Sequence, residues 1–135
     1  MQVKIDDVEM PTSLSRKEAS GSLDITYTGD RDKLYTILIY DVDAPYPEDP
    51  SSSPYLHYAV VNIPGGEIKQ GDTIMPYTPP HPPKDSKEHR YIISLFIQKS
   101  RIVPIDIKAR IRFDVNSFVA RHNLKLVEEF SFSVG

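Results

Sequence analysis

The chain has 135 residues, a formal net charge of −3 and no cysteine. The lack of cysteine excludes disulfides, thiolate metal sites and a cysteine nucleophile, and the acidic balance argues against a dedicated nucleic-acid-binding protein, which usually presents a basic face. No apolar run approaches the roughly 20 residues of a membrane span, and the charged N-terminal stretch does not resemble a signal peptide. We therefore expect one cytoplasmic domain covering residues 1–135.

The apolar pattern, followed in chain order, predicts a mainly β protein. Residues 22–28 alternate between polar and apolar side chains, as in a strand with one buried face. Residues 34–42, 57–63 and 90–98 are almost continuously apolar and rich in β-branched and aromatic side chains. Such runs are typical of central strands that are buried on both faces. Residues 130–134 alternate again and predict a final strand.

One short helix is predicted near the C-terminus. Asp114 suits its start, because a carboxylate can accept hydrogen bonds from the free backbone N–H groups of a first turn. The apolar face that follows, with helical spacing, consists of Val115, Phe118, Val119 and His122. Residues 103–107 predict a short edge strand, because Pro104 cannot donate to a neighbouring strand. These elements together favour a β-sandwich with one late helix.

Proline is concentrated in two predicted loops. Ten of the twelve prolines lie between positions 45 and 83, and nine of these ten are in residues 45–54 and 76–88. Proline fixes φ and lowers the entropy lost when a loop becomes ordered. Ordered loops at the ends of strands are common places for a binding site.

Polar side chains gather at the same strand ends. Asp41 and Asp43 close one predicted strand, His57 opens another, and His89 with Tyr91 opens a third. Positions two apart on a strand share a face, so His89 and Tyr91 are expected to face one way, and so are Asp41 and Asp43 if their strand continues that far. If the strands are neighbours, these side chains meet at one rim of the sheet.

Two histidines and an aspartate at one rim are also compatible with a metal site or a hydrolytic site. However, their spacing matches no compact metal-ligand motif, and neither a Gly-x-Ser-x-Gly motif nor a Gly-x-x-x-x-Gly-Lys phosphate loop is present. His122 is expected to be structural, and His81 to be a solvated loop residue. We therefore expect no metal, no cofactor and no catalytic residue.

Two sequence blocks surround the proline-rich loops. The first is DVDAP at residues 41–45 followed by HYAVVNIPG at 57–65, and the second is YTPPHPP at 77–83 followed by HRY at 89–91. In composition, order and spacing these blocks resemble the signatures of the phosphatidylethanolamine-binding protein family, which includes the Raf kinase inhibitor proteins and the plant flowering-time regulators. Residues 113–124 resemble the Phe-x₄-Phe helix of that family.

The resemblance implies a β-sandwich with a large central sheet and a small pocket at one end. In the family this pocket binds phosphate, acetate or phosphorylethanolamine-type headgroups. The residues of this chain that match its lining are Asp41, His57, His89 and Tyr91, and those that match its walls are Pro45, Tyr55, Pro82 and Pro83. Asp43 and Arg90 are expected to form a buried ion pair beneath the pocket, and the Ala44–Pro45 bond is expected to be cis.

This sequence departs from the family pattern in two respects. Pro79, Asp85 and Lys87 stand where many members have glycine. Longer members continue into a C-terminal helix near the pocket mouth, whereas the chain stops at Gly135. We therefore expect a compact member with a stiffer loop and a more open pocket.

The resulting functional expectation is a non-enzymatic binding protein. Its partner is expected to be a phosphate-containing or phosphorylethanolamine-type headgroup, in a signalling or membrane-associated role with peripheral membrane contact. The alternative is a protein-interaction or inhibitor module for a kinase or protease, with a vestigial pocket. A third class, a hydrolase of phosphate or acyl esters, lacks a positioned nucleophile in the sequence.

Overall fold

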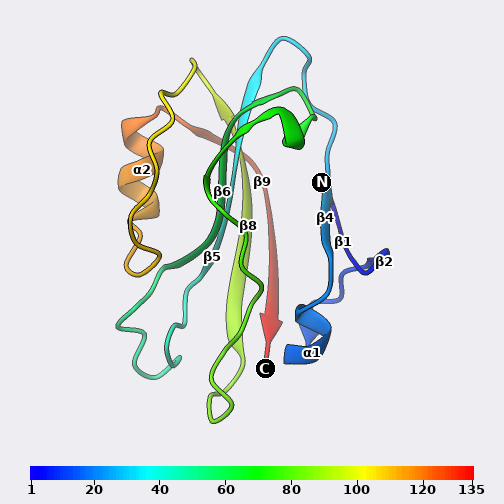
Figure 1. The fold of residues 1–135 in the computed structure, drawn as a ribbon, viewed down its shortest axis with the longest axis vertical. Coiled ribbons are helices and arrows are strands. Elements are labelled where there is room, and N and C mark those ends of the chain that lie inside the picture. Colours follow the sequence, from blue (N-terminus) through cyan, green and yellow to red (C-terminus); the bar gives the residue numbers. More distant parts are fainter.

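The computed structural model describes residues 1–135 and arranges them in three layers (Figure 1). A three-stranded sheet forms one outer layer and a six-stranded sheet forms the middle layer. The other outer layer consists of helix α2 (Val115–Arg121) and residues 99–113, which precede it. The predicted mainly β sandwich with a short helix late in the chain is therefore confirmed.

The six-stranded sheet has the order β3-β9-β8-β5-β6-β7. All neighbouring strands in it are antiparallel except β3 and β9, which are parallel. Its strands are β3 (Ser13–Leu14), β5 (Leu34–Asp41), β6 (Tyr55–Pro64), β7 (Asp72–Met75), β8 (His89–Gln98) and β9 (Lys125–Val134). A 3₁₀ turn, η1 (Ile68–Gln70), joins β6 to β7.

The smaller sheet has the antiparallel order β2-β1-β4. Its strands are β1 (Gln2–Ile5), β2 (Val8–Glu9) and β4 (Leu23–Thr26). Helix α1 (Arg16–Ala19) begins at Ser15, whose side chain and that of Glu18 form a reciprocal capping box. Neither helix has the length and hydrophobicity needed to cross a membrane.

Alternate residues of β5 face two different cores, which explains its continuous apolar run. Ile37 and Ile39 belong to the core between the two sheets. Leu38 and Tyr40 belong to the core between the large sheet and α2. The prediction of central strands buried on both faces is confirmed here, because each face of β5 contacts a different layer.

Helix α2 forms where it was predicted. The Asp114 carboxylate accepts a hydrogen bond from the Ser117 backbone N–H at 3.0 Å, and Asn123 follows the helix in the left-handed region with φ of 52°. The ring of His122 packs against that of Phe118 at a centroid distance of 4.6 Å. This contact agrees with a structural role for His122.

The predicted edge strand at residues 103–107 is wrong. This stretch has no strand assignment; the Ile107 backbone N–H donates to the Ile74 carbonyl of β7 at 3.2 Å. This is the one backbone hydrogen bond between residues 103–107 and β7, so no ladder forms along the edge. Val103 and Ile105 are consequently 78% and 71% exposed, rather than packed under a strand.

We expect Leu38→Ala to lower the free energy of unfolding by about 2–5 kcal/mol, because Leu38 is fully buried and its truncation leaves a cavity. Urea denaturation followed by far-UV circular dichroism measures the change. Leu126→Ala is the matched control, because Leu126 on β9 is 48% exposed, and its cost should stay below about 1 kcal/mol. Equal losses in the two variants would contradict the two-core arrangement.

Candidate functional site

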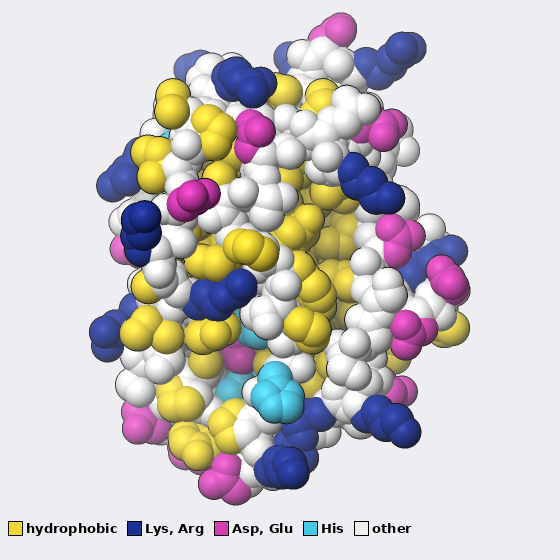
Figure 2. Space-filling view, in the orientation of Figure 1, with side chains coloured by type: hydrophobic (Ala, Val, Ile, Leu, Met, Phe, Trp, Pro, Cys, Tyr) yellow, Lys and Arg dark blue, Asp and Glu magenta, His cyan; other side chains and the backbone are white.

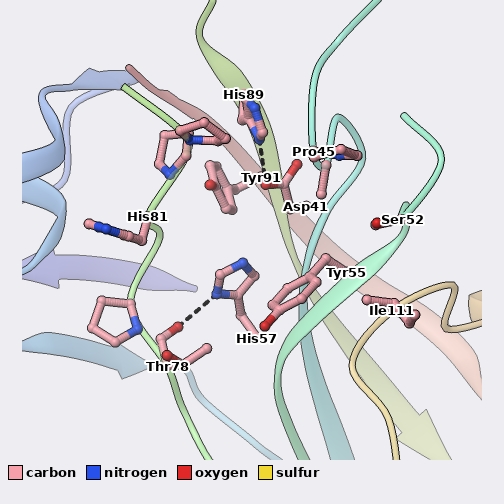
Figure 3. A pocket seen from close by; sticks show the side chains of 14 residues that line it. Asp41, Pro45, Ser52, Tyr55, His57, Thr78, His81, His89, Tyr91 and Ile111 are labelled. Atoms are coloured by element: carbon pink, nitrogen blue, oxygen red, sulfur yellow. Dashed lines mark hydrogen bonds and ion pairs between the residues drawn. The ribbon is translucent and has the colours of Figure 1, made fainter. Parts of the chain in front are cut away.

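A pocket of about 430 Å³ lies at the end of the large sheet where β5 ends and β6 and β8 begin (Figure 3). It is lined by all eight residues that the sequence assigned to it: Asp41, Pro45, Tyr55, His57, Pro82, Pro83, His89 and Tyr91. The structure therefore brings these side chains together as predicted. Their role in binding a ligand stays a prediction.

Strand register explains why these residues meet. Asp41, the last residue of β5, lies opposite Tyr55 of β6 on one side and opposite Tyr91 of β8 on the other. Three adjacent strands therefore place one row of polar side chains at the sheet end. His57 and His89 lie two residues from this row on β6 and β8, and so they share its face.

The Asp41 carboxylate is fully engaged inside the protein. One oxygen lies 2.7 Å from Nδ1 of His89, and the other accepts the backbone N–H of Asp43 at 2.7 Å. Asp41 and His89 are only 3% and 1% exposed. A buried carboxylate needs such partners, because desolvation without them is costly. Asp41 therefore fixes the orientation of His89 and requires Nδ1 of that ring to carry a proton.

The opposite nitrogen of His89 contacts a serine. Nε2 of His89 lies 2.9 Å from Oγ of Ser86, and the Ser86 hydroxyl also lies 2.8 Å from the carbonyl oxygen of Lys87. Asp41, His89 and Ser86 thus form a continuous hydrogen-bonded chain. No sequence motif predicted this contact of Ser86. Ser86 is not among the residues that line the pocket.

The orientation of His57 is set by a backbone carbonyl. Its Nδ1 lies 2.7 Å from the carbonyl oxygen of Thr78, so Nδ1 carries a proton and donates. Nε2 is turned toward the pocket (Figure 3). Burial lowers the pKa of His57 below its ordinary value. The neutral ring therefore presents a lone pair to the pocket, and the protonated ring presents a second N–H donor.

Tyr91 carries the one buried side-chain polar atom without a hydrogen-bond partner, its hydroxyl. Its ring lies between His57 and His89, at centroid distances of 5.3 and 6.4 Å. Burial raises the pKa of Tyr91, and the nearby Asp41 carboxylate raises it further through its charge and as a hydrogen-bond acceptor, although no contact of the hydroxyl meets full hydrogen-bond geometry. The hydroxyl therefore keeps its proton. A buried, unpaired donor costs about 1–3 kcal/mol, which an acceptor on a ligand can recover.

The walls come from the two proline-rich loops. The Ala44–Pro45 bond is cis, as predicted, and so is Ser53–Pro54. The Tyr55 ring stacks obliquely against His57 at 5.0 Å. The lining residues that sequence reasoning missed are Ala44, Ser52, Thr78, Pro79, His81 and Ile111. His81 is exposed, as a loop residue was expected to be, but it stands at the pocket mouth.

Arg110 holds the mouth of the pocket in place. Its guanidinium donates to the carbonyl oxygens of Leu56, His57 and Pro76, at 3.1, 3.2 and 2.8 Å. It thereby ties the segment before α2 to the start of β6 and to the second proline-rich loop. On the opposite side, Arg16 of α1 donates to the carbonyl of Pro83 at 3.2 Å. No sequence pattern connects these distant positions.

The predicted ion pair of Asp43 and Arg90 is present, but it is not buried as expected. Its N–O distances are 2.8 and 2.9 Å, and the Asp43 side chain is 2% exposed, whereas that of Arg90 is 71% exposed. Arg90 points outward because it alternates with His89 and Tyr91. The shared face of Asp41 and Asp43 was expected only if the strand continued to Asp43, and this condition is not met, because β5 ends at Asp41.

No group of three or more His, Cys, Asp and Glu side chains is arranged to hold a metal ion. The titratable side chains of the pocket instead form two separate units. Asp41 is paired with His89, and His57 is bound to a backbone carbonyl. The site therefore offers hydrogen-bond donors around a small aromatic cavity.

A model of the phosphatidylethanolamine-binding protein family matches residues 4–129. The chain belongs to this family. It is 39% identical over 109 residues to the rice protein MOTHER of FT and TFL1 homolog 2, covering 76% of the chain and 60% of the relative. It is 30% identical over 134 residues to the Drosophila melanogaster putative odorant-binding protein A5, covering 92% of the chain and 64% of the relative. The chain thus spans less than two thirds of the length of these relatives.

Solved structures of the family have the same fold. A carboxypeptidase Y inhibitor, solved in complex with its cognate proteinase, matches with a TM-score of 0.81 at 23% identity, over 98% of this chain and 81% of that one. The phosphatidylethanolamine-binding protein from Plasmodium vivax matches with a TM-score of 0.76 at 17% identity, over 98% and 83%. At these identities the likeness establishes the fold.

We expect Asp43→Ala to lower the free energy of unfolding by about 1–3 kcal/mol, because the Arg90 backbone N–H loses its acceptor. Hydrogen bonds from Arg90 hold the pKa of Asp43 below its ordinary value. The pair therefore stabilises the fold fully above the unfolded-state pKa of about 3.9, and this contribution is lost as the pH falls through the lower folded-state pKa.

Thermal melts of wild type and Asp43→Ala between pH 3 and 7 test this expectation. The difference between the two proteins should be constant at neutral pH and shrink at acidic pH. Asp106→Ala, an exposed aspartate in the segment before α2, is the matched control and should leave the melting temperature unchanged. A difference that stays constant down to the lowest pH would contradict a stabilising charge on Asp43.

Proposed function

We propose that this family member is a binding protein whose pocket takes a phosphate monoester headgroup of the phosphorylethanolamine type. The observation that carries the proposal is the buried Tyr91 hydroxyl, a donor with no partner in the protein, held between two histidines. A phosphate group is rich in acceptors and satisfies such a donor. The family name and the dimensions of the pocket support the same ligand class.

His57 supplies the second contact in this proposal. In its protonated form, Nε2–H points into the pocket while Nδ1–H stays bound to the Thr78 carbonyl. A phosphate oxygen then accepts from Tyr91 and from His57. Hydrogen bonds to an anion are stronger than those between neutral groups. Because burial favours the neutral ring in the free protein, anion binding must be accompanied by uptake of a proton.

The remaining pocket walls suit the organic part of the headgroup. The Tyr55 ring and the rings of Pro45 and Pro82 line the cavity beside the histidines. They provide apolar contact for the two-carbon stem, and an aromatic face attracts an ammonium group. Asp41 lines the pocket but offers no favourable contact to the phosphate, because an ionised carboxylate is negatively charged and only accepts hydrogen bonds.

A second candidate function is ester hydrolysis, favoured by the chain of Asp41, His89 and Ser86. Its heavy-atom order is that of a hydrolytic triad, with serine Oγ near His Nε2 and the carboxylate on Nδ1, but the Ser86 hydroxyl donates its proton to the Lys87 carbonyl. Ser86 lies outside the pocket lining, and for this reason binding remains the leading proposal. Turnover of a phosphate or acyl ester that disappears in Ser86→Ala would favour hydrolysis over simple binding.

We expect the affinity of the pocket for a phosphorylethanolamine-type anion to fall as the pH rises from 5 to 8, because the neutral form of His57 turns a lone pair toward the ligand. Isothermal titration calorimetry with ethanolamine O-sulfate measures this, since the sulfate keeps its charge across the range. Buffers of different ionisation enthalpy should reveal proton uptake. His57→Gln, which keeps a donor but cannot titrate, is the control. A flat wild-type profile would refute the charged-histidine model.

We expect Tyr91→Phe to weaken binding of phosphorylethanolamine about tenfold or more, the value of one hydrogen bond to a charged group. The same variant should change the melting temperature little, because the hydroxyl has no hydrogen bond of full geometry in the free protein and only the nearby Asp41 carboxylate as an acceptor. Calorimetry and differential scanning fluorimetry give the two readouts. Unchanged affinity in Tyr91→Phe would remove the main support for the proposed ligand.

A further inference from the structure

A second cavity, of about 480 Å³, lies at the end of the large sheet opposite to the pocket. There β5 begins, β8 ends and β9 begins. We call this cavity the basic cleft. The polar side chains that line it are Asp32, Lys33, Gln98, Lys99, Ser100, Asn123 and Lys125. In Figure 2 this end of the molecule is uppermost, and Lys and Arg side chains, in dark blue, lie there as well as elsewhere on the visible face. The proposed headgroup site makes no use of these residues.

Strand pairing forces the lysines of the cleft together. Leu34 of β5 lies opposite Gln98 of β8, and Lys33 and Lys99 each come one residue beyond that pair. Lys125 lies opposite Ile97 on the other side of β8. Three neighbouring strands therefore deliver three ammonium groups to one end of the sheet. Like charges facing each other across strands are destabilising.

These charges are balanced only in part inside the protein. The ion pairs of the chain involve the N-terminus, His89, Arg90 and Arg101, and none includes a lysine of the cleft. Asp32 is the one carboxylate in the lining, so three lysines and one aspartate leave a formal charge of +2. The whole chain carries −3, so this basic end stands out against an acidic molecule.

The neutral side chains of the cleft add unused donors. The Ser100 hydroxyl and the Asn123 side-chain amide form no hydrogen bond within the protein. The side-chain amide of Gln98, in contrast, is already hydrogen-bonded to Asn62 and Thr36. Asn123 is held in the left-handed region at the end of α2, which fixes its position beside β9. Ammonium, hydroxyl and amide donors around one hollow match an anion with several acceptor oxygens.

We propose that the basic cleft is a second binding site, for an anion that carries more than one phosphate group. Three ammonium groups on separate strands call for a ligand with distributed charge, because one monoanion cannot neutralise all three. The same chemistry is found in a free polyphosphate and in a polyphosphorylated lipid headgroup. The site is independent of the pocket, since the two share no residue.

Titration of ¹⁵N-labelled protein with inorganic pyrophosphate tests the proposal. Amide shifts are expected at Lys33, Lys99, Ser100, Asn123 and Lys125. Lys99→Glu should weaken binding about tenfold or more at low salt, by reversing one contact charge, and added sodium chloride should weaken binding to the wild type. Lys108→Glu is the matched control, because Lys108 is exposed outside the cleft, and it should bind as the wild type does.

A neutral variant separates lost binding from lost folding. Lys99→Gln removes one of the repelling charges, so without ligand it should melt at the wild-type temperature or slightly above it, while its affinity for pyrophosphate falls. Tyr91→Phe should keep the full affinity of the cleft, so failure of the headgroup site leaves this test intact. Flotation with vesicles that contain phosphatidylinositol bisphosphate shows whether a lipid headgroup also fits. Equal binding by Lys99→Glu and Lys108→Glu, or shifts confined to the pocket, would overturn the proposal.

Discussion

The Asp41 carboxylate is the interaction on which the site depends. It is buried, so each of its oxygens requires a partner: His89 occupies one, and the backbone of Asp43 occupies the other. Asp43, turned by that bond, uses its own carboxylate to hold Arg90 on the outer face. Two aspartates thus bind two consecutive residues of β8, one inside and one outside. The end of β5 and the start of β8 are clamped together from both faces.

This clamp leaves two groups free to meet a ligand. Asp41 and His89 satisfy each other, and the Thr78 carbonyl occupies one side of His57. Among the buried polar side chains of the pocket, the hydroxyl of Tyr91 and the second nitrogen of His57 are the groups left to meet a ligand. The pocket therefore differs from a metal centre, where several side chains converge on one point. Its chemistry is that of a few fixed donors in a small aromatic cavity, which suits recognition by hydrogen bonding.

Much of this arrangement could be predicted from the sequence because the strong signals are local. The apolar runs of β5, β6 and β8 identified the central strands, and the two loop blocks identified the lining of the pocket. Strands β1, β2, β3 and β7 and helix α1 were not predicted, because two to four residues each are too few to show a period. The face of the Asp43 side chain could not be predicted, because side chains alternate between two faces only within a strand and β5 ends at Asp41. No sequence pattern predicted that Arg110 and Ile111 lie at the pocket. Their contacts are with segments far away in the sequence and exist only in the folded chain.

Arg110 reaches the pocket rim through three backbone carbonyls and no side chain. Every residue type has a carbonyl, so this attachment is indifferent to which amino acids the loops carry. Side chains at the mouth, such as Pro79, His81 and Ile111, can therefore be exchanged while the frame that holds them keeps its shape. Substitutions at the rim can therefore change ligand preference while the backbone of the loops and the sheet beneath them keep their structure.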